Sequence, residues 1–112
     1  MVGNYIITKH ALQRYEQRTN ESKLSVQRRI LRDLKALRNK KIVHIGPTKH
    51  VFYTQPNGNV REFILEESKT KKDTYYVTTI INRTPESSKI AYEKRLKCKE
   101  EYNKNNKEIA ND

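Results

Sequence analysis

The hydrophobic pattern of this chain changes its period once, near Lys41, and that change constrains the fold more than any other feature. Before it, apolar residues recur at helical spacing, most regularly at Val26, Ile30, Leu34 and Leu37. After it, short β-branched and aromatic runs alternate with turn residues. A block of helix followed by a block of strand predicts an α+β domain, with the helices on one face of a curved antiparallel sheet.

Local signals place the ends of several elements. Thr8 can cap a first helix over residues 9–18, and Thr84 followed by Pro85 marks the start of a last helix. The turn residues 56–59 contain Asn-Gly, which adopts positive φ readily. Residues 4–7 form either a brief strand or a lead-in to the first helix. About four strands are expected, at 42–45, 50–54, 60–66 and 75–81, and the last of these, β-branched and aromatic, is expected to be the central strand.

Composition favours a single domain. Of the 112 residues 34% are hydrophobic, enough for one small core. We expect the domain to cover residues 1–99 and the polar residues 100–112 to form a frayed tail. Cys98 is the only cysteine, which excludes an intramolecular disulfide and a cysteine-based zinc site. With no run resembling a signal peptide and no apolar stretch of about 18 residues, we expect a cytoplasmic protein without a membrane span.

The net charge indicates an anionic partner. Lys and Arg total 24 against 13 Asp and Glu, a formal charge of +11. Residues 9–41 carry 11 of these basic side chains and only three acidic ones. Such an excess attracts polyanions over long range. Nucleic acid is the most common partner of this kind, and an anionic membrane surface or an acidic protein is a less common one.

The first helix carries a cationic stripe. His10, Arg14 and Arg18 lie at i, i+4 and i+8, so they share one face of a helix with about 3.6 residues per turn. Their mutual repulsion would be relieved by a phosphate. The neighbouring apolar positions, Ala11 and Tyr15 among them, give the helix a side to bury. The alternative interpretation is an ordinary solvated charged face.

The second helix has a basic back opposite its apolar stripe. The side chains expected to contact RNA are Arg28, Arg29, Arg32 and Lys35. A solvated face on a core helix is an equally good interpretation, although its field would still steer a polyanion. His44 and His50 flank the Gly46-Pro47 turn, and without a carboxylate or thiolate partner we interpret them as surface residues of edge strands, not as a metal site.

The order of elements and one motif resemble a known superfamily. The opening Ile-Thr-Lys-His-Ala-x-x-Arg-x-x-x-Arg helix, the second helix, the aromatic hairpin and the Tyr-Val-Thr-Thr-Ile strand extend over residues 5–83. Together they resemble the BrnT and RelE-like ribonuclease toxins of bacteria and phages. The resemblance implies a metal-independent endoribonuclease that needs no cofactor, with RNA in a basic cleft between the first helices and the sheet. It also implies attack of a ribose 2′-OH on the adjacent phosphorus, and often an antitoxin partner.

Such a reaction requires an acid/base group and fixed positive charge. His10 is the acid/base candidate because histidine titrates near neutral pH, and Arg14 and Arg18 can clamp a phosphate bidentately. Further candidates, matched by position to the superfamily, are Arg61 as a second clamp, Thr79 as a hydroxyl donor and Tyr53 as a donor or base-stacking platform. Strand alternation places Glu62, the only nearby strand carboxylate, on the face opposite Arg61, which argues against Glu62 as the general base.

Three functional hypotheses therefore stand. The first is an RNA-cleaving enzyme of the toxin type. The second is a non-catalytic phage or host-directed regulatory protein on the same fold that binds RNA or a host protein. The third is a module that captures an acidic host protein. The sequence leaves RNA specificity, the protein partner and the oligomeric state open.

Overall fold

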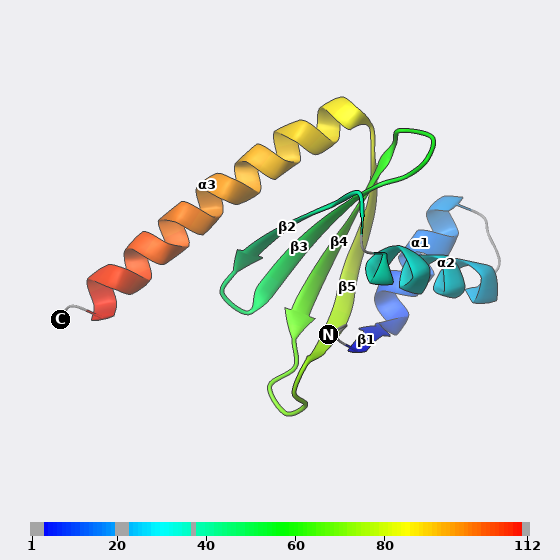
Figure 1. Cartoon of the computed structure of the whole chain (residues 1–112). Coiled ribbons are helices and arrows are strands. Elements are labelled where there is room, and N and C mark those ends of the chain that lie inside the picture. The colour runs from blue at the N-terminus through cyan, green and yellow to red at the C-terminus, as the bar shows by residue number, and fades with distance from the viewer. Residues whose placement is uncertain (1–3, 20–22, 37, 111–112) are drawn as a thin grey trace.

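A computed structural model of the chain describes residues 4–19, 23–36 and 38–110, and within them the chain forms three helices and a five-stranded sheet (Figure 1). The elements are β1 (Asn4–Ile7), α1 (Lys9–Thr19), α2 (Lys23–Lys35), β2 (Lys40–Ile45), β3 (Thr48–Thr54), β4 (Val60–Glu67), β5 (Thr74–Arg83) and α3 (Pro85–Ala110). The predicted α+β class is confirmed. No described helix is long and apolar enough to cross a membrane.

The sheet has the strand order β1-β5-β4-β3-β2. The four predicted antiparallel strands are present, and the opening residues form a fifth strand that pairs parallel with β5. The prediction that residues 75–81 form the central strand is wrong, because β4 lies in the middle and is the most deeply buried strand. The central position of β4 was not predicted because the strand contains two charged residues, Arg61 and Glu62, and both are buried.

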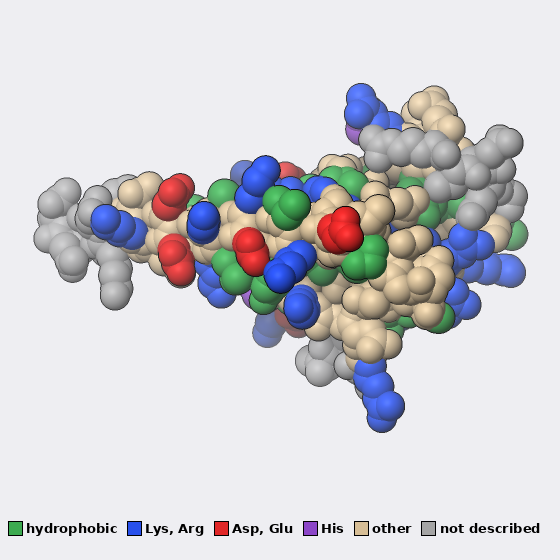
Figure 2. All heavy atoms as spheres, turned by 90° about the horizontal axis from the view of Figure 1, so that it is seen from above, with side chains coloured by type: hydrophobic (Ala, Val, Ile, Leu, Met, Phe, Trp, Pro, Cys, Tyr) green, Lys and Arg blue, Asp and Glu red, His purple; other side chains and the backbone are tan. Residues whose placement is uncertain are grey.

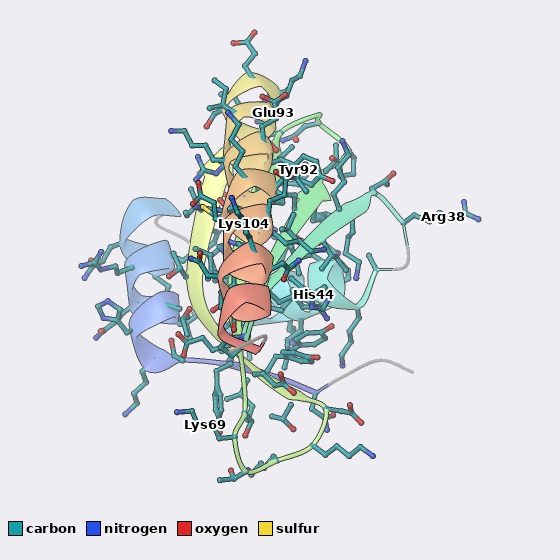
Figure 3. The ribbon with its side chains drawn as sticks, turned by 90° about the vertical axis from the view of Figure 1, so that its left-hand side faces the viewer. Arg38, His44, Lys69, Tyr92, Glu93 and Lys104 are labelled. Carbon is teal, nitrogen blue, oxygen red and sulfur yellow. The ribbon has the colours of Figure 1, made fainter. Side chains whose placement is uncertain are left out.

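The helices cover both faces of the sheet, which corrects the expectation that they share one. α1 and α2 pack on one face and α3 crosses the other (Figures 1 and 3). Two separate cores result. The first is formed by Leu12, Tyr15, Val26, Ile30, Leu34, Val51, Phe63, Leu65, Val77 and Ile80, and the second by Val43, Phe52, Val60 and Ala91. Tyr92 of α3 packs edge-on against the Phe52 ring, with ring centroids 5.6 Å apart.

The predicted local signals hold where the structure describes them. The Thr8 hydroxyl accepts from the Ala11 amide at 3.2 Å, and the Thr84 hydroxyl accepts from the Ser87 amide at 3.2 Å, so both threonines cap helices. Gly58 turns the β3–β4 hairpin with a φ of +91°. Leu37 lies outside the described residues. α3 continues through residues 100–110, where the sequence suggested a frayed tail. Tyr102 still lies against Gly46 of the β2–β3 turn, and the C-terminal end of the helix projects away from the sheet (Figures 1 and 2).

Candidate active site and nucleic-acid interface

The stripe predicted on α1 faces outward. Leu12 and Tyr15 are buried against the sheet, so His10 and Arg14 on the other side of the helix are exposed. The side chain of Arg18 lies outside the described part of the structure. His10 and Arg14 are therefore available to a partner in solution, but they do not face the sheet.

Arg61 lies beneath α1 and α2 and is almost fully buried. Its guanidinium forms an ion pair with the buried carboxylate of Asp33, on α2. It also donates to the side-chain oxygens of Asn82 and Gln55, each at 3.4 Å, and lies 5.6 Å from the centre of the Tyr15 ring. Burial raises the pKa of the Asp33 carboxyl, and the Arg61 charge opposes that shift. The charge of Arg61 is thus balanced by Asp33 inside the core.

The predicted catalytic residues whose side chains the structure describes, His10, Arg14, Arg61 and Thr79, do not converge. Arg61 pairs in register with Asn82 and Tyr53, on the face covered by α1 and α2. Thr79 pairs with Ile64 and lies on the opposite face, because successive strand residues alternate between faces. The predicted site is thus divided among the α1 surface, the core under α2 and the α3 face.

The predicted basic surface of α2 is present. Arg28, Arg32 and Lys35 are exposed and Arg29 is half-buried. A shallow groove of about 470 Å³ runs along it and is lined by Leu24, Ser25, Arg28, Arg29 and Arg32. Lys and Arg side chains are also numerous on the flank of the molecule opposite the projecting end of α3 (Figure 2). This surface can contact a polyanion through several phosphates.

A different set of reactive groups meets on the α3 face, which we call the Glu62 cluster. The Glu62 carboxylate, from the central strand, has no exposed surface. It accepts from Arg83 Nε at 2.7 Å through one oxygen, and from Arg95 Nε at 3.2 Å through the other. His50 Nδ1 lies 3.1 Å from that second oxygen. The cluster thus joins an imidazole and two guanidiniums from β3, β5 and α3 to one carboxylate.

The electrostatics of Glu62 follow from these contacts. Burial by itself would raise the pKa of its carboxyl. The hydrogen bonds from His50 and Arg83, together with the charges of Arg95 and Arg83, outweigh burial and hold the pKa at about 2. Glu62 is therefore ionised throughout the physiological pH range. Its strength as a base depends on whether the guanidiniums of Arg83 and Arg95 stay next to the carboxylate.

A pocket opens beside the Glu62 cluster, and we call it the α3 pocket. It has a volume of about 380 Å³ and is lined by Arg83, Ser87, Ile90, Ala91, Lys94 and Arg95. Figure 3 shows α3 running over this face of the sheet. Three cationic side chains border the pocket, so an anion entering it would meet the same guanidiniums that hold Glu62.

A second pocket, which we call the amide pocket, lies at one end of the sheet. It has a volume of about 450 Å³ and is lined by Tyr15, Arg29, Gln55, Asn57, Asn59, Arg61, Asn82, Arg83 and Thr84. Arg29 also lines the α2 groove, and Arg83 also lines the α3 pocket. The amide pocket therefore shares residues with both the basic helix surface and the Glu62 cluster.

Sequence reasoning missed His50, Arg83 and Arg95 as members of a site. The interpretation of His50 as a surface residue is wrong, since it is 7% exposed and β3 is an interior strand. One signal was available: Arg61 and Glu62 interrupt the apolar run from Val60 to Leu65, and a carboxylate in a buried strand needs charged partners. Its partners could not be named, because they lie 12, 21 and 33 residues away along the chain.

Comparison with known proteins found no matching family model, no matching curated protein and no matching solved structure. The resemblance to ribonuclease toxins thus stays a prediction from the sequence. Within the described residues, no three His, Cys, Asp or Glu side chains gather as metal ligands would.

The low pKa of Glu62 predicts how stability depends on pH. The pKa is about 2 in the folded protein against an ordinary value of 4.5. This group's contribution is therefore fully present above pH 4.5 and is lost as the pH falls through 2, a change of about 3 kcal/mol. Urea unfolding at several acidic pH values should show it, and Glu62→Gln should remove that part of the dependence. Glu93→Gln, at an exposed position on α3, should leave it unchanged.

Proposed function

We propose that this protein binds RNA and cleaves it without a metal ion, using the Glu62 cluster. One observation carries the proposal: nitrogens of one imidazole and two guanidiniums lie within 3.2 Å of the oxygens of a single buried carboxylate, beside a cationic pocket. Attack of a ribose 2′-OH on the adjacent phosphorus requires groups of these kinds: a base, an acid and fixed positive charge. The position of the site differs from the one expected from the α1 stripe.

The roles follow from the chemistry of each group. The Glu62 carboxylate takes the proton of the 2′-OH as the 2′-oxygen forms a bond to phosphorus. The bond from phosphorus to the 5′-oxygen breaks, and the His50 imidazolium gives that oxygen a proton through its second ring nitrogen. Arg83 and Arg95 bind the phosphate oxygens, where negative charge accumulates. The products are a 2′,3′-cyclic phosphate and a free 5′-hydroxyl.

Glu62 becomes a stronger base when Arg83 and Arg95 leave its carboxylate and bind the phosphate instead. A phosphate in the α3 pocket would draw Arg83 and Arg95 away from the carboxylate, since both side chains line that pocket. The carboxyl would then lose its stabilising cations and gain a neighbouring anion, and both changes raise its pKa. Substrate binding thus turns a very weak base into a stronger one, and it uncovers a group that is otherwise fully buried.

The exposed α2 surface supports binding of the rest of the RNA. Arg28, Arg32 and Lys35 point to solvent on α2, on the other face of the sheet, and would hold more distant phosphates of a strand that passes through the amide pocket. A cytoplasmic location fits the exposed free thiol of Cys98. An antitoxin or a host protein that covers this basic surface would keep such an enzyme inactive.

The test is cleavage of an unpaired RNA oligonucleotide in the presence of EDTA. We expect cleavage to persist with the chelator and to yield 2′,3′-cyclic phosphate ends. An oligonucleotide with deoxyribose at every position should stay intact, because it lacks the nucleophile. Cleavage that EDTA abolishes, or that also occurs with DNA, would contradict the proposal.

A second candidate function is RNA binding without catalysis. The observation that favours it is the complete burial of Glu62 among three partners, which also describes an ion network that fastens α3 to the sheet. RNA binding that weakens steeply with salt, with no turnover under any condition, would select this candidate over the enzyme.

A further inference from the structure

The amide pocket has walls that present hydrogen-bond donors. Arg61 donates to the side-chain oxygens of Gln55 and Asn82 at the back of the pocket. Because a guanidinium can only donate, each amide must turn its oxygen toward Arg61 and its NH2 group away from it. The Asn57 oxygen is likewise held, because it accepts from the Asn59 backbone amide at 3.0 Å.

Three amide NH2 groups are thus oriented by the protein itself. In the described part of the chain, the NH2 groups of Gln55, Asn57 and Asn82 have no protein hydrogen-bond partner. The cationic Arg29 and Arg83 add to the donor character of the lining. A ligand that suits these walls must offer acceptors to several donors at once.

The pocket has the size and position for one nucleoside. Its volume of about 450 Å³ lies in the range of about 300–1,000 Å³ typical of small-ligand sites. The β3–β4 turn and the end of β5 lie at the same end of the sheet (Figure 1). Arg83 borders both the amide pocket and the α3 pocket, so a nucleotide bound by this arginine can reach the amides with its base.

We propose that the amide pocket is a base-binding subsite that selects the keto bases guanine and uracil over the amino bases adenine and cytosine. This inference rests on the proposed RNA function, to which it adds a specificity. Guanine presents O6 and N7, both acceptors, and uracil presents O4. Adenine and cytosine present an exocyclic amino group at the corresponding position, which would set donor against donor and leave both unpaired.

Binding of mononucleotides tests the subsite without any cleavage, because a mononucleotide has no phosphodiester to break. We expect GMP and UMP to bind the intact protein about tenfold more tightly than AMP and CMP in calorimetric titrations. Ribose 5-phosphate measures the contribution of the sugar and phosphate without a base. Equal affinity for all five probes, or no binding of any of them, overturns the subsite. If the protein prefers GMP but does not cleave RNA, only the proposed catalysis is overturned.

Two variants locate the effect. Asn82→Asp replaces the NH2 donor by an acceptor of the same shape, next to Arg61, and should abolish the preference for GMP over AMP. Asn57→Asp makes the same change on an exposed turn, where folding is not at risk, and should weaken the preference. Asn103→Asp, on the exposed part of α3, adds the same charge elsewhere and should leave the preference unchanged. A GMP preference that survives both pocket variants would place the selectivity at another site.

Discussion

Replacing His50 by glutamine should lower the rate of RNA cleavage by about 10²–10⁴-fold, the usual contribution of a general acid or base. The glutamine amide can still donate to Glu62, so the fold and the ion pairs around the carboxylate should be kept. It cannot deliver a proton to the leaving oxygen, however. The rate should therefore fall while RNA affinity, measured under conditions where nothing is cut, stays close to that of the unmodified protein.

Two other histidines provide the controls. His44→Gln, at an exposed position on β2, should leave the rate unchanged. His10→Gln tests the acid/base role predicted from the α1 motif, and because His10 is exposed and faces away from the Glu62 cluster, we expect an effect on RNA affinity only. A large loss of rate in His10→Gln together with a normal rate in His50→Gln would return catalysis to the first helix.

Local features of the sequence predicted local features of the structure. The helical spacing of Ile30 and Leu34 predicted α2, and Thr8 and Thr84 predicted the starts of α1 and α3. Both signals are local, because periodicity and capping depend on residues a few positions apart. Strand alternation also placed Arg61 and Glu62 on opposite faces, as the register confirms. These signals suffice for the fold class.

Contacts between distant segments were beyond the reach of the same reasoning. Whether α3 covers the face of α1 or the other one depends on how the chain leaves β5, which no spacing within α3 records. The face that α3 covers determines the site, because Arg95 of α3 reaches Glu62 only on the face opposite α1 and α2. Similarly, Arg61 was predicted to be free to bind a phosphate, because its counter-ion, Asp33, lies 28 residues earlier in the chain, on α2.

The pair formed by Arg61 and Asp33 predicts the largest effect on stability. Asp33→Ala should reduce the free energy of unfolding by about 3–5 kcal/mol, because it leaves the guanidinium buried without its counter-charge. The two remaining side-chain hydrogen bonds of Arg61, at 3.4 Å each, are long and go to neutral amides. Urea unfolding followed by circular dichroism measures the loss. Asp33→Asn, which keeps the shape of the side chain but not its charge, is the comparison variant.

The double variant Asp33→Leu with Arg61→Leu separates loss of the pair from loss of packing. Replacing both charges by apolar side chains removes the unpaired guanidinium, so the double variant should be more stable than Asp33→Ala and close to the unmodified protein. It should also lose the GMP preference, because without Arg61 nothing turns the oxygens of Gln55 and Asn82 inward. A double variant that unfolds as readily as Asp33→Ala would mean that the buried ion pair itself, with its hydrogen bonds, stabilises the fold. A stable double variant that still prefers GMP would mean that the amides are oriented by something other than Arg61.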